Sequence, residues 1–433
     1  MRANTRGAVL FFLMSLAAGS TALPPAHGAN GINLTGFGAE SAVMGGADLA
    51  VARDTSALNT NPAGLSQIAG RAFDNYFAVA YAVDVSHADR FGNDGGVSND
   101  LIALGGGGYA QRLGNSKITA GIGLFAQGGA GYVYEDLNTP FGARDELSAL
   151  FRIAKLSPGL AYQVNDSLSL GASLGVIYAD IEQKVFPDTS FFNAADPSRS
   201  FFGFKLEDAR ALEFGFRLGA QYRVNEQIRL GMAFSPKTEL PLENGRVEAN
   251  LSAIGLGKVT YRDARVEGLA LPTEAGMGIA YEPAPTLLLS IELTWLDWSN
   301  ALRSLHLRAS NPENPAAPAV LENTAALDWR DQYVVAVGAA WKVNEKTVVR
   351  AGYNYGRNPV PARTLSPLLA TIAEHHVALG FGRRVGAEWE IATGIEYQIP
   401  AKVTYTNPES PFGAGEEERN EVLILHLMLS RRW

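Results

Sequence analysis

Chemistry in this chain would depend on hydroxyl, imidazole and carboxyl side chains, because its 433 residues include no cysteine. The absence of thiols excludes disulfides, thiolate metal sites and cysteine nucleophiles. His375, His376 and His426 lie in the C-terminal part, but no Gly-x-Ser-x-Gly motif and no ligand-spaced histidine cluster accompanies them. We therefore expect no catalytic triad, no metal site and no cofactor.

The overall charge argues against nucleic acid as a partner. The chain has 36 basic and 44 acidic residues, for a net charge of −8, whereas phosphate binding needs a basic surface. Charged residues make up 18%, below the roughly 25% that is typical of soluble domains. The length fits two or three soluble domains or one large closed barrel.

Residues 1–28 have the pattern of a secretory signal peptide, which is removed on export. Arg2 and Arg6 precede an apolar run from Ala8 to Ala18, and small residues lead up to residue 28. The run is too short for a membrane-spanning helix, which needs about 20 residues. No apolar run of 18 residues follows, so we expect a periplasmic or secreted protein, or an outer-membrane barrel.

Alternating segments favour the barrel. Between Leu327 and Lys342, one set of alternate residues is large and apolar, while the other is small or polar. The large set is Leu327, Trp329, Tyr333, Val335, Val337 and Trp341. Aromatic residues near both ends of an aliphatic band are typical of a lipid-facing barrel wall.

Short and long connections alternate along the chain. The short polar turns are 113–116, 164–167, 224–227, 282–286, 343–346 and 384–388. The longer linkers are 88–99, 135–146, 185–203, 237–264, 304–327, 358–372 and 406–418. This alternation is typical of outer-membrane barrels, which have short periplasmic turns and long outer loops.

The fold class that these patterns predict is all-β, a 14-stranded antiparallel transmembrane barrel over residues 71–433. The predicted strands are 71–87, 100–112, 116–134, 147–163, 167–184, 204–223, 227–236, 265–282, 286–303, 328–343, 346–357, 373–384, 387–405 and 419–433. Strand 227–236 is the weakest of these, because 237–264 could contain its continuation. The last strand ends on Trp433, an aromatic terminus that resembles the signal read by the barrel-assembly machinery.

Residues 29–70 differ from the predicted wall, since they are small and rich in glycine and alanine. A barrel of about 14 strands leaves an interior that side chains alone do not fill. This segment could be a disordered tail, but a hatch that closes the lumen is physically reasonable.

Several blocks resemble the FadL/TodX family of outer-membrane transporters for hydrophobic compounds. They are Gly45–Ala50, Asp54–Ala57, Asn61–Leu65, Leu271–Thr273, Trp295–Ser299, Trp329–Tyr333, Arg350–Tyr353 and Asn358–Pro361. The resemblance implies a barrel in the outer membrane of a Gram-negative bacterium, closed by an N-terminal hatch. It also implies passive import of long-chain fatty acids or hydrocarbons, with sideways exit at a kinked third strand.

Two sets of residues are candidates for the gate. Asn61, Pro62 and Ala63 would form a rigid elbow facing the opening, because proline fixes φ and asparagine favours turns. Gly128, Gly129 and Gly131 fall inside the third strand, where glycine marks a bulge or a bend. Each set also has an ordinary structural explanation, a simple turn or a bulge without a window.

Ligand-binding candidates lie in the outer loops and on the inner wall. An apolar molecule would be captured by loop residues Phe191, Phe192, Phe201, Phe202, Leu365, Leu368 and Leu369, unless these loops simply pack on one another. A fatty-acid carboxylate would need a cation, for which the candidates are Arg152, Lys155, Arg330 and Arg350. Arg152 and Lys155 are three residues apart and therefore lie on opposite faces of a regular strand, so both face inward only if a bulge separates them.

Other functions fit less well. A general diffusion porin would have a charged lumen and no hatch, while an enzyme would need a catalytic constellation. An adhesin or a purely structural barrel is a further alternative. We expect a monomer whose partners are an apolar ligand and membrane lipid.

Overall fold

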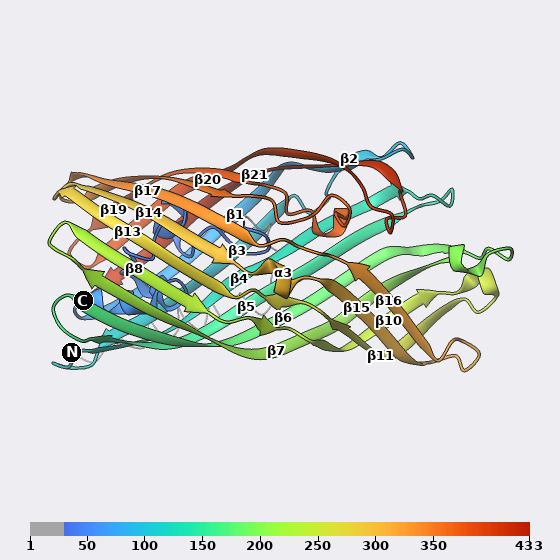
Figure 1. Cartoon of the computed structure of the whole chain (residues 1–433), viewed down its shortest axis with the longest axis horizontal. Coiled ribbons are helices and arrows are strands. Elements are labelled where there is room, and N and C mark those ends of the chain that lie inside the picture. Colours follow the sequence, from blue (N-terminus) through green and yellow to red (C-terminus); the bar gives the residue numbers. More distant parts are fainter. Residues whose placement is uncertain (1–29) are drawn as a thin grey trace.

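The computed structural model describes residues 30–433, in which fourteen antiparallel strands form a closed barrel (Figure 1). The predicted signal peptide, residues 1–28, lies outside the described residues. The fourteen strands are β1 (Arg71–Ala88), β3 (Leu101–Arg112), β4 (Ile118–Asn138), β5 (Arg144–Gln163), β6 (Leu168–Phe191), β7 (Phe201–Arg223), β8 (Ile228–Ser235), β13 (Glu274–Ala284), β14 (Leu287–Leu296), β17 (Gln332–Asn344), β18 (Thr347–Gly356), β19 (His375–Val385), β20 (Trp389–Thr406) and β21 (Ala414–Arg432).

Each strand pairs with the next along this series, and β21 pairs with β1 to close the ring. The remaining pairs continue the same order from β7 to β21. Closure pairs the first strand with the last, so the ring has no unpaired terminal strand, as a wall in lipid requires. The fourteen-strand prediction is therefore confirmed.

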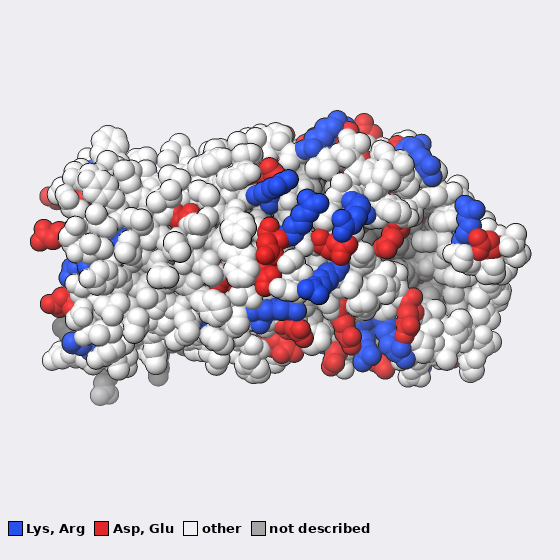
Figure 2. Space-filling view, viewed as in Figure 1, with Lys and Arg blue, Asp and Glu red and all other residues white. Residues whose placement is uncertain are grey.

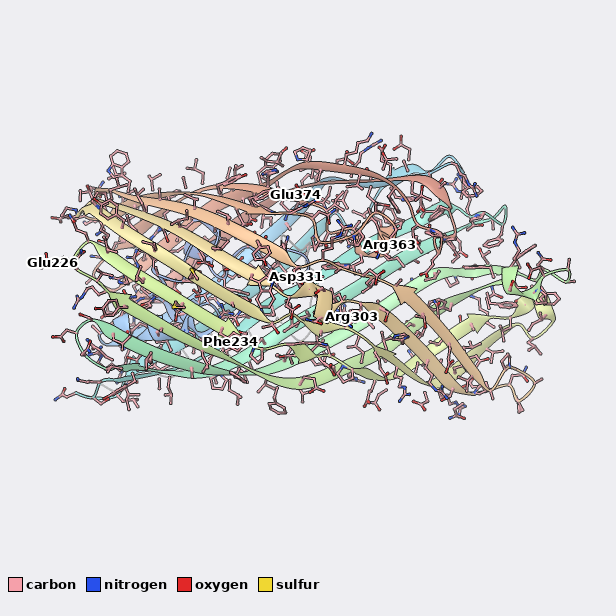
Figure 3. All side chains as sticks on the ribbon, in the orientation of Figure 1. Glu226, Phe234, Arg303, Asp331, Arg363 and Glu374 are labelled. Atoms are coloured by element: carbon pink, nitrogen blue, oxygen red, sulfur yellow. The ribbon has the colours of Figure 1, made fainter. Side chains whose placement is uncertain are left out.

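The alternation of side chains places one row inside and one outside. On β21, Val422, Ile424 and Met428 are buried, while Leu425 and Leu427 are about half exposed. Figure 2 shows that charged side chains are sparse over much of the surface and gather in a belt that contains both signs. Figure 3 places Arg303, Asp331 and Arg363 in that belt, with Phe234 nearer the end that holds the C-terminus. The belt marks where the apolar band of the wall ends.

We name the two ends of the barrel by their connections. The turn end carries the C-terminus and the six short turns, and the loop end carries the long connections (Figure 1). Among residues 30–433, no helix is long and apolar enough to cross a membrane.

Two predicted loops are wrong, because they contain strands. Residues 237–264 and 304–327 include most of a four-stranded extension that continues the wall at the loop end, beside β7. Its strands are β10 (Leu242–Asn250), β11 (Lys258–Glu267), β15 (Ser304–Pro312) and β16 (Val320–Ala326). Three further short strands are β2 (Asp94–Gly96), β9 (Thr238–Glu239) and β12 (Ala270–Leu271).

The extension also corrects several predicted strand ends. Residues 265–267 belong to β11, so the wall strand begins later, at Glu274. The next strand ends at Leu296 and is followed by the short helix α3 (Trp298–Ala301). Strand β17 begins at Gln332, because the chain before it turns inward. Leu327 and Trp329, predicted to face lipid, are buried, and the ring of Trp329 packs edge-on against Trp298 at 5.3 Å.

Residues 30–70 fold inside the barrel at the turn end (Figure 1). They contain helix α2 (Ala39–Val43) and the 3-10 helices η1 (Thr55–Leu58) and η2 (Pro62–Gln67). Three more 3-10 helices lie in the loops, η3 (Pro197–Arg199), η4 (Ser252–Ile254) and η5 (Pro367–Leu369). Because residues 30–70 contact every one of the fourteen strands, we call this segment the hatch.

Candidate functional site

The kink in β4 leaves part of that strand without its wall neighbour. Strand β4 pairs with β3 only from Thr119 to Phe125, whereas Leu101–Gly105 of β3 pair with β1 alone. Contact between the two segments resumes further on, where the Ser98 N–H donates to the Val133 carbonyl over 2.8 Å. The unpaired interval on β3 covers five residues, or about 17 Å of strand.

Glycine makes this departure possible. The pairing of β4 with β5 shifts between Ala126 and Gly128, which leaves Gln127 as a bulge. Gly129 has a φ of +146°, and a Cβ there would lie 2.2 Å from the Phe151 carbonyl oxygen. Every residue from 128 to 132 is buried, so the alternation between exposed and buried side chains stops here. The strand has left the wall and entered the lumen.

The start of the hatch occupies the free edge of β4. Asn33 forms an isolated antiparallel bridge with Gly128, and the Gly129 N–H donates to the Ile32 carbonyl over 2.9 Å. A Cβ on Gly128 would lie 2.2 Å from that same carbonyl oxygen. The hatch therefore acts as a short substitute strand, and it approaches the kink too closely for a side chain at residue 128.

The Asn-Pro-Ala elbow lies elsewhere than predicted. Asn61 caps η2 by accepting from the Ala63 N–H, and its amide donates to the carbonyls of Leu49 and Ala220 over 2.7 and 3.1 Å. Helix η2 packs mainly against β5, β6 and β7, and a Cβ on Gly219 would lie 2.0 Å from Asn61 Oδ1. The elbow is thus seated on the closed wall.

Another hatch residue contacts the kinked strand. The Asn59 side-chain amide donates to Gln127 Oε1 over 2.8 Å. Neither Gln127 nor Ile32 was a candidate from the sequence. A bulged polar residue beside a run of glycines was a possible signal for Gln127, whereas nothing in the sequence pairs residue 32 with residue 129.

Two of the four cation candidates do not face the lumen. Arg152 points outward, because β5 has no bulge between it and the inward Lys155, and it pairs with Asp180 and Glu182 on the neighbouring strand. Arg330 is exposed in the connection before β17, which leaves it outside the barrel interior. These positions are wrong as luminal carboxylate ligands.

The other two cations face inward at the level of the hatch. Arg350 is buried and pairs with Glu40 of α2 over 2.7 Å, so a hatch carboxylate already neutralises it. Lys155 is buried beside Phe125 in the strand register, on the turn-end side of the kink. Arg217, which sequence reasoning missed, donates to the Thr60 carbonyl and pairs with Glu274 over 2.8 Å.

A small polar cavity lies between the hatch and the wall. It measures about 70 Å³ and is lined by Asn33, Gln127, Arg217, Glu274 and Glu292 among others. Glu292 accepts from the backbone N–H groups of Asp48 and Leu49 over 3.0 and 2.9 Å. Burial raises the pKa of Asp48 to about 6. This space is too small and too polar to hold a long apolar molecule.

The apolar part of the lumen lies on the loop-end side of the hatch. One cluster joins Ile32 to Tyr132, Phe151 and Leu365. Leu365 was predicted to be a loop residue open to solvent, but it is fully buried, because η5 folds into the lumen and packs on β4 and β5. Leu368 and Leu369 pack partly buried on the same cluster.

The phenylalanine residues divide between a stack and open positions. Phe141 lies 5.4 Å from Phe191 and 4.7 Å from Phe201 between ring centres. Phe191 and Phe192 remain 41% and 43% exposed, while Phe201 and Phe202 are half-buried. The loops therefore pack on one another and still present apolar rings at the loop end.

These features define a closed transmembrane barrel of the outer-membrane type, with a filled lumen and one interrupted wall position. Residues 16–421 match the sequence profile of the family described as outer membrane protein transport protein (OMPP1/FadL/TodX). The chain belongs to this family, whose members are located in the outer membrane and form a transport family rather than an enzyme family.

Individual relatives are distant in sequence. Outer membrane protein P1 of Haemophilus influenzae is 25% identical over 268 residues, which cover 56% of this chain. The chain spans about half the length of the curated relatives it matches, 54% for this protein.

Solved structures agree over more of the chain. The P. putida toluene transporter TodX has a TM-score of 0.75 at 19% identity, covering 93% of this chain and 99% of that one. A Pseudomonas aeruginosa FadL homologue has a TM-score of 0.72 at 17% identity, with the same coverage. At such identities the agreement supports the fold alone.

Proposed function

We propose that this protein lets hydrophobic molecules, long-chain fatty acids or hydrocarbons, pass the outer membrane passively and leave sideways through the wall at the β4 kink. The observation that carries the proposal is the free edge of β4 at Gly128 and Gly129, occupied by a hatch segment in place of a wall strand. A relative described as a toluene transporter supports an apolar cargo.

Capture begins at the loop end. The exposed rings of Phe191 and Phe192, beside the stack around Phe141, offer an apolar surface that water wets poorly. An apolar molecule bound there would next meet Leu368 and Leu369 of η5, which border the luminal cluster. Binding follows from the removal of apolar surface from water.

The gate is the hatch segment Asn30–Phe37. Within residues 30–433, a single backbone bridge pairs this segment with β4, between Asn33 and Gly128, with the hydrogen bond from the Gly129 N–H to the Ile32 carbonyl. A ligand that displaces Ile32 from the luminal cluster would release this segment and open the unpaired interval toward lipid. No energy input is needed, because an apolar molecule gains free energy on entering the bilayer.

A porin function fits the packing less well. Diffusion of polar solutes needs a continuous aqueous channel, but the hatch fills the lumen with buried residues and contacts all fourteen strands.

The test is to straighten β4. In a variant that combines Gly129→Val with Gly131→Val, the left-handed backbone at residue 129 becomes strained by about 1–3 kcal/mol, so uptake should fall about tenfold. Uptake of a radiolabelled apolar compound by whole cells is measured at matched surface expression. Gly95→Val, where a Cβ meets nothing within 4 Å, is the control. Undiminished uptake in the double variant would rule out lateral exit.

A further inference from the structure

The inner faces of β19, β20 and β21 carry a stripe of polar residues beside the apolar cluster. Alternate inward positions hold Glu396 and Gln398 on β20, and Glu416, Glu418 and Asn420 on β21. His376 of β19 pairs with Gln398 across the strands. All six side chains are buried, so their polar atoms must be satisfied inside the lumen.

The hatch end of the stripe is a satisfied network. Glu396 accepts from the Thr35 hydroxyl of the hatch over 2.7 Å, and its other oxygen lies 3.2 Å from His426 Nε2. His426 Nδ1 lies 3.2 Å from the Tyr76 hydroxyl. This carboxylate therefore already has its partners.

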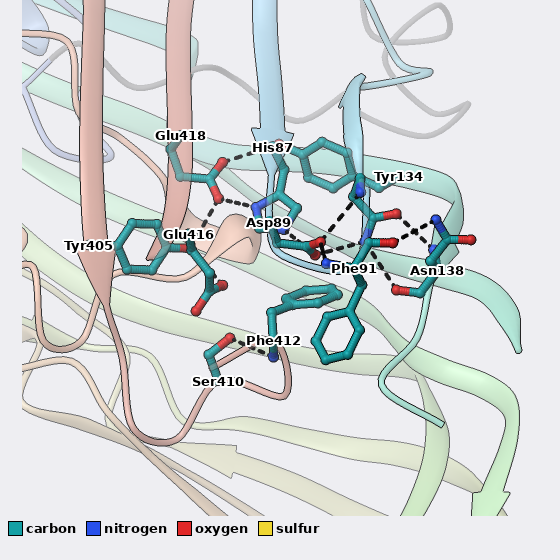
Figure 4. Close-up of polar contacts among 11 residues, drawn as sticks. His87, Asp89, Phe91, Tyr134, Asn138, Tyr405, Ser410, Phe412, Glu416 and Glu418 are labelled. Atoms are coloured by element: carbon teal, nitrogen blue, oxygen red, sulfur yellow. Dashed lines mark hydrogen bonds and ion pairs between the residues drawn. The ribbon is translucent and has the colours of Figure 1, made fainter. Parts of the chain in front are cut away.

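At the outer end of the stripe, Glu418 is held by hydrogen bonds, whereas within residues 30–433 Glu416 is bonded through Oε2 and its Oε1 has no hydrogen-bond partner (Figure 4). His87 bridges Glu418 and Asp89 over 2.6 and 3.1 Å. The Tyr405 hydroxyl lies 3.0 Å from both Glu416 and Glu418. Both contacts of Glu418 reach its Oε1, and the Tyr134 hydroxyl donates to its Oε2 over 3.5 Å, which fixes the loop end of the stripe.

The middle of the stripe lacks partners. Within residues 30–433, neither the oxygen nor the nitrogen of the Gln398 amide has a hydrogen-bond partner, and the same holds for Asn420 and for His376 Nε2. Gln398, Asn420 and His376 are 0%, 1% and 1% exposed. An unsatisfied buried polar group costs about 1–3 kcal/mol, so these atoms require a partner that brings both donors and acceptors.

This middle section borders the proposed path. Gln398 pairs with Val422, a member of the apolar cluster that also holds Ile32 and Tyr132. Val422 pairs with Ala82, one residue beyond the Tyr81–Leu101 pair at the border of the unpaired interval. A molecule in the cluster can therefore touch the free amides before it leaves.

We propose that Gln398, Asn420 and His376 bind an uncharged hydrogen-bonding group of the transported molecule, such as a hydroxyl or a carbonyl. This inference rests on the proposed uptake function and narrows its cargo to apolar molecules with a neutral polar group. The two amides both donate and accept, as such a group requires, and His376 Nε2 lies among them as a further polar atom without a partner within residues 30–433.

The same surroundings disfavour a carboxylate. Gln398 lies two residues from Glu396, and Asn420 two residues from Glu418, a spacing of about 7 Å along a strand. Within residues 30–433, the ion pairs of the stripe carboxylates involve only histidine, with no lysine or arginine. Lys155 and Arg217 lie at the hatch level, and Arg217 is already paired. An anionic head in the stripe would be repelled by these carboxylates, whose histidine partners are already engaged.

The test compares three ligands of equal chain length, dodecanol, dodecanoate and dodecane. Full-length protein in nanodiscs binds a fluorescent apolar probe, and each ligand displaces it at pH 7.5. Gln398→Met and Asn420→Leu remove the amides, and Gln111→Met at the turn end is the matched control. For each ligand, the dissociation constant of the variant is divided by that of the wild type, which cancels the partitioning of the ligand into lipid.

We expect dodecanol to bind at least tenfold more tightly than dodecanoate. Each stripe variant should lower the affinity for dodecanol about tenfold, which is the contribution of one hydrogen bond. The affinity for dodecane should not change. The stripe proposal would be overturned if dodecanoate bound as tightly as dodecanol, or if the variants lowered the affinities for dodecanol and dodecane equally. Either result would leave the proposed uptake function standing. If none of the three ligands displaces the probe, the proposed function fails as well.

Discussion

At the scale of single residues, one buried ion pair fastens the hatch to the wall. Arg350→Gln removes the main counter-charge of Glu40. The free energy that favours the packed hatch over an opened hatch should fall by about 3 kcal/mol. Hydrogen exchange of hatch peptides around residues 39–46 should accelerate accordingly. The control is Arg363→Gln, whose pair with Asp328 is exposed. Equal protection in both variants would show that the pair does not hold the hatch.

Asp54 makes the hatch sensitive to pH. Burial, helped by the nearby Asp74 and Glu40 and opposed by Arg432, raises the pKa of Asp54 from 3.8 to about 7. The packed hatch thus binds the proton more tightly than an opened hatch, and stability should decline as the pH rises from 3.8 to about 7.

Asp54→Asn should weaken this dependence and leave the part that Asp48 contributes, because asparagine can still cap η1 but does not ionise. Exchange of the η1 amides, corrected for intrinsic rates, should be faster at pH 8 than at pH 5 in the wild type, and this difference should be smaller in the variant. Asp136→Asn, in an exposed pair, is the control. A variant that keeps the wild-type pH profile would contradict the assignment.

The cation candidates show what residue-level reasoning can and cannot supply. Parity alone indicated that Arg152 and Lys155 could share a face only through a bulge, and β5 has none there, so Arg152 lies outside. Parity could not show that Arg350 is already paired with Glu40, because that partner lies in a distant segment. The inward row of β21, from Glu416 to Asn420, was readable from the sequence and was overlooked.

At the scale of elements, the loop-end extension is joined to the closed ring through the pairing of β10 with β7. Strand β15 pairs with β11 and with β16, and within residues 30–433 neither β15 nor β16 pairs with a wall strand. Their polar, weakly alternating sequences gave no strand signal, and their pairing depends on distant partners.

Replacing residues 304–326 with a short Gly-Ser turn should therefore leave the barrel folded. The thermal midpoint measured by circular dichroism should change by no more than a few degrees, which corresponds to roughly 1 kcal/mol. Removal of β13 and β14 should instead prevent closure, because both pair within the ring. Loss of folding in the first deletion would mean that the extension supports the wall.

The bend of β4 was predictable from the sequence, but the segment that occupies its free edge was not. Three glycines in one strand predict a bend, since glycine tolerates the backbone that the bend needs. The occupant of the free edge, Asn30–Asn33, could not be foreseen, because a single bridge has no sequence pattern. Whether the bend opens toward lipid stays a prediction.

At the scale of the whole molecule, the fourteen-strand barrel was predictable because lipid imposes its own periodicity. An outward apolar row and the sorting of connections by length are consequences of crossing a bilayer, so both appear in the sequence. The interior carries no such rule. Its hatch contacts, buried pairs and free amides come from packing between distant segments, which a single sequence does not encode in any local pattern.

The most direct test of lateral exit maps where a ligand touches the wall during uptake. Cells expressing the protein take up an apolar compound with a photoreactive group, are irradiated, and the labelled peptides are identified by mass spectrometry. The account predicts labelling at Leu101–Gly105 and at residues 126–131, lost in the variant with Gly129→Val and Gly131→Val. Labelling that follows the lumen to the turns at 113–117 and 164–167, with none beside the kink, would contradict it.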